Sequence, residues 1–204
     1  MPKIRVLLLL SGGIDSPVAG FLAQQQNFEI IAVHFASKFI GRNPEDKCKD
    51  VCEKLTFSKL IVLNASPAFE ELAKQCAHGL YFVLMKRFML KTSEYLAEKE
   101  NCSFLVTGES LGQVSSQTLA NLSVIQSAIH IPLLRPVLAL DKEEIIQIAK
   151  KIGTYEISIG PESCDILGSK HPNTQAILSV IESEEKKLDY KTLIQNCLTT
   201  SRKI

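Results

Sequence analysis

The residues whose types and spacing best suit chemistry form the segment SGGIDS at positions 11–16, directly after the apolar run Val6–Leu10. Two adjacent glycines let the backbone approach a ligand, and a helix that begins here presents free N–H groups to an anion. Ser11 and Ser16 add hydroxyl donors. The Asp15 carboxylate favours a Mg²⁺ ion between itself and a phosphate, or orients the loop. The segment indicates a phosphate-binding loop, and a plain strand-to-helix turn is the alternative.

Three further places carry reactive or polar groups. Gln113–Gln117 follows a predicted strand end, and its amide and hydroxyl groups can read a base edge or a ribose; a helix start rich in capping residues is the alternative. Lys142 begins a predicted helix, where a cation gains nothing from the helix dipole, so a solvated surface lysine is its plain interpretation. Cys164 lies in a loop bounded by Pro and Gly, which makes it a candidate nucleophile.

The other cysteines give weaker signals. Cys48 and Cys52 are spaced i, i+4 and can pair on a metal, but no second pair has zinc-like spacing, so packed or surface thiols are favoured. Six cysteines scattered over 204 residues do not form a secreted disulfide framework, so we expect free thiols. Cys76, Cys102 and Cys197 are interpreted as packing residues.

Alternating apolar strands and helices must position these groups. Strands are predicted at 4–10, 29–35, 59–64, 103–107 and 131–134, with helices between them; the long helical stretch 67–98 is expected to break near Gly79. Ser16 is expected to cap the first helix, with Pro17 as its first residue, and Asp141–Glu144 resembles a capping box. The pattern predicts an α/β fold with a doubly wound parallel sheet, whose ligands bind beyond the carboxyl ends of the strands.

Composition narrows the class of protein. With 46% hydrophobic and 22% charged residues, the chain is typical of a globular protein, and its net charge of +1 favours RNA contact only through a local patch or with help. The first apolar run is too short to span a bilayer and lacks a cleavage pattern, so we expect a cytoplasmic protein without a membrane partner. We expect one domain over residues 1–172, with a helical tail over 173–204 packed on it.

The segment SGGIDS resembles the PP-loop of the ATP pyrophosphatase superfamily. The resemblance implies a Rossmann-like fold and cleavage of ATP between its α- and β-phosphates, with a carbonyl oxygen activated as an adenylate. It implies that Ser11, Gly12, Gly13, Asp15 and Ser16 hold the phosphates of ATP, with Mg²⁺ reached by Asp15 through them. It also implies that adenosine lies against strand ends formed by Val33, His34, Phe35, Thr107 and Gly108, mainly through backbone atoms; a purely structural role for His34 is the alternative.

A longer motif is more specific. Residues 106–121, VTGESLGQVSSQTLAN, are similar to the signature of the tRNA 4-thiouridine synthetase (thiamine biosynthesis protein ThiI) family, and Leu134–Pro136, Asp141–Glu144 and Pro161–Cys164 follow in that family's order. The resemblance implies that a tRNA uridine is adenylated and then thiolated to 4-thiouridine. Within it, Lys142 assists adenylyl transfer and Cys164 handles sulfur. Substrate contacts are expected from Gln113, Ser116, Gln117 and Arg135.

The sequence departs from the family pattern in two respects. The N-terminal ferredoxin-like segment, the tRNA-binding THUMP domain and the rhodanese domain have no counterpart here, so we expect tRNA to arrive through a separate THUMP-domain protein. The C-x-x-C of some archaeal members is replaced by Phe82–Met85, so we do not expect an iron–sulfur cluster. Two alternatives stay open: an enzyme that thiolates or amidates a small carbonyl compound, such as one of the thiamine thiazole route, and a non-catalytic nucleotide-binding subunit. The sulfur donor is a persulfide carrier or sulfide, and the resemblance allows a homodimer.

Overall fold

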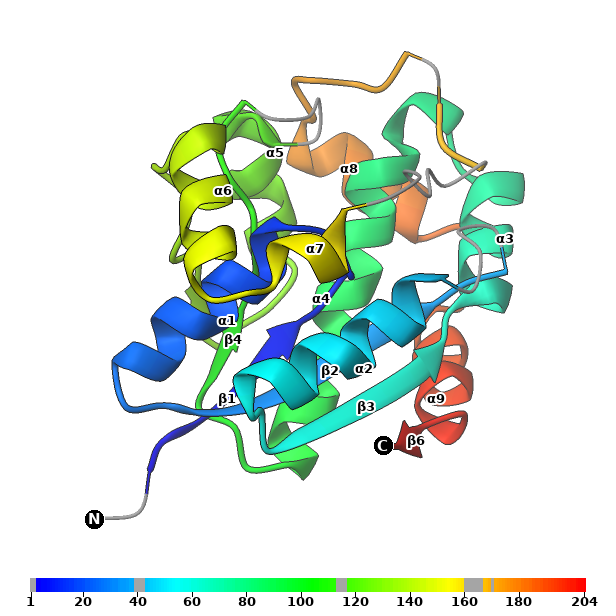
Figure 1. The fold of residues 1–204 in the computed structure, drawn as a ribbon. Coiled ribbons are helices and arrows are strands. Elements are labelled where there is room, and N and C mark those ends of the chain that lie inside the picture. Colours follow the sequence, from blue (N-terminus) through cyan, green and yellow to red (C-terminus); the bar gives the residue numbers. More distant parts are fainter. Residues whose placement is uncertain (1–2, 39–42, 113–116, 160–166, 170) are drawn as a thin grey trace.

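A mixed sheet lies at the centre of the computed structural model, with its strands in the order β5-β4-β1-β2-β3-β6 (Figure 1). The structure describes residues 3–38, 43–112, 117–159, 167–169 and 171–204. Strands β1 to β5 run parallel, and β6 pairs antiparallel with the edge strand β3. The strands are β1 (Arg5–Leu9), β2 (Glu29–Ala36), β3 (Lys59–Asn64), β4 (Phe104–Val106), β5 (Leu133–Leu134) and β6 (Arg202–Lys203).

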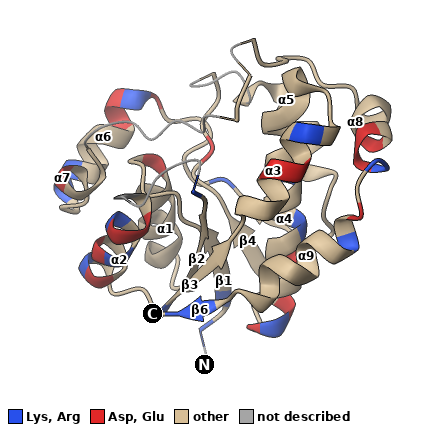
Figure 2. Ribbon diagram, turned by 90° about the vertical axis from the view of Figure 1, so that its right-hand side faces the viewer, with Lys and Arg blue, Asp and Glu red and all other residues tan. Residues whose placement is uncertain are grey.

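Helices cover both faces of the sheet, as the view in Figure 2 shows. One face carries α1, α2, α6 and α7, and the other carries α3, α4, α5, α8 and α9. The predicted fold class, a doubly wound α/β sheet, is confirmed. The helices are α1 (Asp15–Gln25), α2 (Asn43–Leu55), α3 (Ser66–Gln75), the 3₁₀ turn η1 (His78–Leu80), α4 (Tyr81–Lys99), α5 (Leu119–Gln126), α6 (Lys142–Lys151), α7 (Tyr155–Ser158), α8 (Leu178–Glu185) and α9 (Tyr190–Thr199).

Strand β1 separates the two hydrophobic cores. Because side chains alternate along a strand, Val6 and Leu8 pack towards α1 and α2, while Leu7 and Leu9 pack towards α3 and α4. All four are buried, which explains why this strand is a continuous apolar run. The C-terminal helices α8 and α9 belong to the core on the side of α3 and α4, through Ile181, Ile194 and Cys197.

The chain leaves β1 and β4 towards opposite faces of the sheet. These two strands are neighbours, and α1 follows β1 on one face while α5 follows β4 on the other. In open α/β sheets, ligands bind at such a switch point, outside the carboxyl ends of the strands. The SGGIDS segment and Thr107–Gly108 both lie at this place.

Two local predictions were wrong, and one short strand was missed. Helix α1 begins at Asp15 after Ile14, so Ser16 is not its cap; the Ser16 hydroxyl turns back to the preceding loop instead. Residues 173–177 are not helical, because Asn173 and Ala176 bond to the side chain of Asn121 rather than to a helix of their own. Strand β6 was not foreseen. The break near Gly79 and the capping box of Asp141 and Glu144 are confirmed.

None of the helices in the described part of the chain combines the length and the apolar composition that crossing a membrane requires.

Candidate functional site

The loop after β1 is held closed by its own serines. The Oγ of Ser16 accepts a hydrogen bond of 3.1 Å from the backbone N–H of Ser11 and lies 3.1 Å from the Oγ of Ser11. The N–H of Gly13 donates to the Oγ of Ser11 at 3.3 Å. Ser16 is buried, whereas Ser11 and Gly13 are exposed. The loop therefore has a fixed shape before any ligand arrives, with Ser16 acting on the inside of the turn.

Two glycines are required by close approach of the backbone. Gly12 has φ +79°, a left-handed conformation, and a Cβ there would lie 2.9 Å from the carbonyl oxygen of Pro44 at the start of α2. A Cβ on Gly108 would lie 2.5 Å from the backbone nitrogen of Ser16. The end of β4 is thus pressed against the first turn of α1, and only glycine permits this contact.

Lys142, the first residue of α6, reaches this loop. Its Nζ lies 2.7 Å from Oδ1 of Asp15, and the side chains are 46% and 22% exposed. The capping box formed by Asp141 and Glu144 fixes where α6 begins, and so fixes the position of Lys142. Asp15, which was expected to reach Mg²⁺, and Lys142, which was expected to assist adenylyl transfer, are therefore in direct contact at the carboxyl edge of the sheet.

A charge cluster around the buried Glu109 lies beside the loop. Glu109 follows Gly108, and its Oε1 lies 3.0 Å from Nζ of Lys86 on α4, while its Oε2 accepts from Nε of Arg135 at 2.8 Å. Burial alone would raise the pKa of Glu109, but the charge of Lys86 and the hydrogen bond from Arg135 outweigh it, so the pKa lies below its ordinary value. Glu109 is therefore a carboxylate at neutral pH.

Two adjoining cavities of about 240 Å³ each open onto these groups. We name them the loop cavity and the strand cavity. They share Leu9, Ser11, Lys86 and Met89, so one extended ligand can occupy both. The loop cavity is also lined by Gly13, Asp15, Ser16, Leu90, Thr107, Gly108, Glu109, Gln117 and Ile125, and the strand cavity by Leu10, Val33, His34, Phe35, Ser37, Pro44, Phe69 and Met85.

His34 lines the strand cavity but is also tied into the fold. Its Nδ1 donates a hydrogen bond of 2.9 Å to the carbonyl oxygen of Leu10, and the Sγ of Cys48 lies 3.4 Å from the same nitrogen. Burial lowers the pKa of His34, which keeps the ring neutral at neutral pH. Val33 and Phe35 flank it on β2, and the N–H of Leu10 donates to the carbonyl oxygen of Val33 at 2.8 Å. The structural and cavity-lining interpretations of His34 are compatible.

The predicted substrate residues are only partly described. Gln113, Ser116 and Cys164 lie outside the described residues. Gln117 lines the loop cavity, and its Oε1 accepts from the backbone N–H of Ser110 at 3.2 Å. Arg135 points inward: it pairs with Glu109 and also donates to Gln126 and to the carbonyl oxygen of Leu122.

Two polar residues of the VTGESLGQVSSQTLAN motif anchor a later part of the chain. Asn121 is fully buried, donates to the carbonyl oxygen of Asn173 at 2.8 Å and accepts from the N–H of Ala176 at 2.8 Å. Thr118 caps α5 and donates to the carbonyl oxygen of Thr174 at 2.7 Å. These contacts explain why uncharged polar residues occur in this part of the motif without lining either cavity.

The described cysteines are all buried and free: Cys48, Cys52, Cys76, Cys102 and Cys197. Burial raises the pKa of each thiol, to about 12 for Cys52 and Cys197 and about 11 for Cys76 and Cys102. Buried thiols of this kind are unreactive, and the packing interpretation is confirmed. No three His, Cys, Asp or Glu side chains gather as a metal site in the described ranges.

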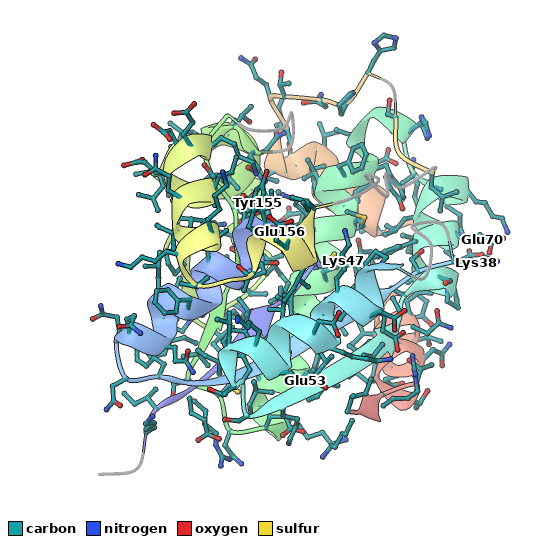
Figure 3. The ribbon with its side chains drawn as sticks, in the orientation of Figure 1. Lys38, Lys47, Glu53, Glu70, Tyr155 and Glu156 are labelled. Carbon is teal, nitrogen blue, oxygen red and sulfur yellow. The ribbon has the colours of Figure 1, made fainter. Side chains whose placement is uncertain are left out.

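Lys47 anchors the chain just before the segment that contains Cys164. In Figure 3, Lys47 extends from α2 towards α7 and its labelled residues Tyr155 and Glu156. Its Nζ donates to the carbonyl oxygens of Ser158 and Ile159, at 3.0 and 3.1 Å. Lysine is suited to the carbonyl-rich end of a helix.

The sequence interpretation missed Glu109 and gave Lys86 no place at these cavities. Glu109 could have been noticed because it is an acidic residue directly after Gly108, at the end of a predicted strand. The partners Lys86 and Arg135 lie 23 and 26 residues away along the chain, so no local pattern joins the three.

Residues 3–190 match the family model described as thiamine biosynthesis protein (ThiI). A probable tRNA sulfurtransferase of Moorella thermoacetica is 40% identical over 201 residues, covering 95% of this chain and 52% of that protein. A crystal structure of a 4-thiouridine synthetase–RNA complex with bound ATP is 36% identical, with a TM-score of 0.93 over 98% of this chain and 54% of that one.

An NMN synthetase from Francisella tularensis, 15% identical, shares the fold alone, with a TM-score of 0.60 over 95% of this chain and 76% of that one. The chain spans about half the length of the curated relatives it matches. Since the family model covers nearly the whole sequence, the chain belongs to the ThiI family.

Proposed function

We propose that this chain is the ATP-dependent catalytic domain of a tRNA sulfurtransferase, which adenylates a tRNA uridine so that sulfur can replace its oxygen to give 4-thiouridine. The observation that carries the proposal is the contact of Asp15 with Lys142 at the glycine-rich loop, beside two joined cavities. Its relatives are named tRNA sulfurtransferases, and a structural neighbour holds both RNA and ATP. The packing of α8 and α9 on α4 supports a single domain for residues 1–172 with the tail 173–204 attached.

ATP fits the two cavities by the chemistry of their walls. The strand cavity is mostly apolar and ends at the backbone of β2, which suits adenine near Val33, His34 and Phe35. The loop cavity offers Ser11, Gly13 and the first turn of α1, which suit phosphate groups. Lys86 lines both cavities, so it would contact ATP where the sugar joins the phosphates.

Asp15 suits Mg²⁺ rather than phosphate. It is the acidic residue on the loop itself, and Mg²⁺ is commonly held by one or two carboxylates together with substrate phosphates. The ion would neutralise charge on the departing pyrophosphate. Lys142 would then give up part of its contact with Asp15 and contact the phosphate that is attacked.

The proposed reaction has two steps. The uridine O4 attacks the α-phosphorus, the bond from that phosphorus to the bridging oxygen breaks, and pyrophosphate leaves with its charge stabilised by the loop N–H groups. Lys142 stabilises the charge that develops on the α-phosphate. Sulfide, or the outer sulfur of a persulfide, then attacks C4, the C4–O bond breaks, and AMP leaves. With a persulfide donor, the Cys164 thiolate would next attack the donor's inner sulfur, so that the S–S bond to the transferred sulfur breaks, the sulfur stays on C4, and Cys164 forms a disulfide with the donor.

The remaining partners are also part of the proposal. A separate THUMP-domain protein would deliver tRNA to a chain of net charge +1, and the sulfur donor would be a persulfide carrier or sulfide. Gln117 lines the loop cavity, and it would contact the uridine together with Gln113 and Ser116. Arg135 would act through its hydrogen bond to Glu109. A homodimer and a cytoplasmic location belong with this assignment.

The test is thiolation itself. The chain is incubated with Mg²⁺–ATP, unmodified tRNA, sulfide and a THUMP-domain protein of the same cell, and digested tRNA is analysed for 4-thiouridine by mass spectrometry. We expect 4-thiouridine only when ATP and the intact chain are present. ATP consumption with a thiazole precursor in place of tRNA would favour the small-molecule enzyme, and ATP binding without AMP formation would favour the non-catalytic subunit.

A further inference from the structure

We infer that Glu109 is a positioning residue, which holds the Lys86 ammonium in place for the nucleotide while Arg135 fixes the other oxygen of the same carboxylate. The inference rests on the proposed function, because it requires ATP in the two cavities. Glu109 is the one buried carboxylate in the described walls of the two cavities. The inference gives it a role other than proton transfer or Mg²⁺ binding.

Both oxygens of Glu109 are engaged. Oε1 lies 3.0 Å from Lys86 Nζ, and Oε2 accepts from Arg135 Nε at 2.8 Å and from the Thr107 hydroxyl at 3.3 Å. Contact with two cations lowers the affinity of this carboxylate for a proton, which makes it a poor acceptor of a substrate proton. Two cations held by one carboxylate also exclude a protonated acid. Glu109 is therefore not a general acid or base.

Lys86 needs such a partner. A lysine ends in a flexible four-carbon stem, and holding it in one position costs side-chain entropy. The ammonium has three donors, and Glu109 accepts from one side, so N–H groups remain for phosphate oxygens. Because Lys86 lines both cavities, fixing it before ATP binds removes a cost that binding would otherwise carry.

The charges of the cluster fit an anionic ligand. Lys86 and Arg135 carry two positive charges against the single negative charge of Glu109. Arg135 is 9% exposed and is bonded to the α5 backbone, so it serves as the rigid side of the cluster. Lys86, at 21% exposed, is the side that meets the cavities. The net positive charge therefore faces the place proposed for the phosphates.

The test is a double-mutant cycle on ATP binding. The dissociation constant of α,β-methylene-ATP with Mg²⁺ is measured by calorimetry for the unchanged chain, E109Q, K86M and the double variant. We expect E109Q to weaken binding about tenfold, because Lys86 loses its anchor and is repelled by Arg135. In the K86M background, E109Q is expected to change binding less than about twofold. KM for ATP should rise more than kcat falls.

The matched control is Glu100→Gln. Glu100 is also buried and held by two lysines, Lys59 and Lys203, but it lies next to the start of β4, away from both cavities. E100Q is expected to leave binding and KM unchanged. Should E109Q not fold, E109D keeps the charge but is one methylene too short to reach both cations, and the same weakening is expected.

Equal weakening by E109Q in both backgrounds would overturn the positioning role alone. So would tighter binding by E109Q, caused by the loss of the negative charge beside an anionic ligand. An equal loss of binding in E100Q would show that E109Q acts through general destabilisation, and would also overturn the positioning role. Absence of binding by the unchanged chain would overturn the proposed function together with this inference.

Discussion

The ammonium of Lys142 lies 2.7 Å from the carboxylate of Asp15, although 127 residues separate them in sequence. One residue belongs to the first turn of α1 and the other to the first turn of α6, so two helix starts meet over the glycine-rich loop. An ion pair this exposed contributes about 1 kcal/mol or less to stability. Because Asp15 also lines the loop cavity, the pair is better explained by chemistry than by folding.

Asp15→Asn and Lys142→Met should abolish adenylation while the fold is retained. We expect AMP formation to fall at least about a hundredfold in each variant, because D15N removes the proposed Mg²⁺ ligand and K142M removes the charge proposed to stabilise the α-phosphate. The melting temperature should change little. The exchanged pair D15K/K142D restores an ion pair but puts each charge in the wrong place, so it should stay inactive.

The control for this prediction is Arg5→Gln. Arg5 pairs with Glu29 at 44% and 28% exposure, close to the values for the Lys142–Asp15 pair, but at the opposite end of β1. R5Q should keep full activity. An active D15K/K142D chain would show that the ion pair is structural.

Gly108→Ala should damage the loop and the nucleotide site together. The added methyl group would lie 2.5 Å from the Ser16 nitrogen, so β4 and α1 must move apart. We expect a loss of stability of about 1–3 kcal/mol by urea unfolding, together with weaker ATP binding. Gly79→Ala is the matched change, because its methyl group would meet nothing closer than 3.7 Å, and it should be tolerated. Equal behaviour of the two variants would refute the close contact.

One thiol should react quickly in the folded protein. Cys48, Cys52, Cys76, Cys102 and Cys197 are buried, with raised pKa values, so iodoacetamide at neutral pH should modify them only on unfolding. We propose that Cys164 is the fast thiol. Peptide mass spectrometry should locate the label there, and Cys164→Ser should remove it. Rapid labelling of any of the other five would contradict this assignment.

Acid should weaken the contact between α4 and α8. Arg87 is 3% exposed and holds Glu185 through two hydrogen bonds of 2.8 and 3.0 Å, with Lys91 at 2.9 Å. Burial would raise the pKa of Glu185, but the bonds from Arg87 and Lys91 bring it below its ordinary value of 4.5. A lowered pKa stabilises the fold above that value, and the contribution is lost as the pH falls below it.

Glu185→Gln should therefore cost about 3 kcal/mol at pH 7, because it leaves Arg87 without its charged partner. The difference from the unchanged chain should shrink as the pH falls below 4.5, measured by urea unfolding. Glu70→Gln is the control: Glu70 pairs with Lys38 at the surface, where Figure 3 shows both side chains, and its loss should change stability little. A pH-independent deficit in E185Q would exclude the charge as its cause.

The fold could be predicted because its signals are local. Continuous apolar runs mark buried parallel strands, and the capping box at Asp141 marks the start of α6. The start of α1 could not be predicted, because the Ser16 hydroxyl accepts a hydrogen bond from Ser11 and does not cap the helix. This bond depends on the folded loop and on Gly108, which packs against Ser16 from another strand. β6 was missed because a two-residue strand gains its bonds from the edge of β3, far away in sequence.

The site was predictable to a similar extent. Loop residues such as Asp15 are marked by the glycines beside them, and Lys142 was found through the family resemblance. The Lys86–Glu109–Arg135 cluster was not predictable, because its members come from α4, the end of β4 and the end of β5. Only the folded chain brings their charges together.

The most direct test of the central claim follows ATP cleavage. Purified chain, Mg²⁺, sulfide and ATP are incubated with unmodified tRNA and a THUMP-domain protein, with the ATP labelled in the α-phosphate in one tube and in the γ-phosphate in a parallel tube, and AMP and pyrophosphate are separated. We predict equal amounts of AMP and pyrophosphate, formed only with tRNA and absent in D15N. No AMP with tRNA and the THUMP-domain protein both present, or AMP formed at the same rate without tRNA, would contradict the account.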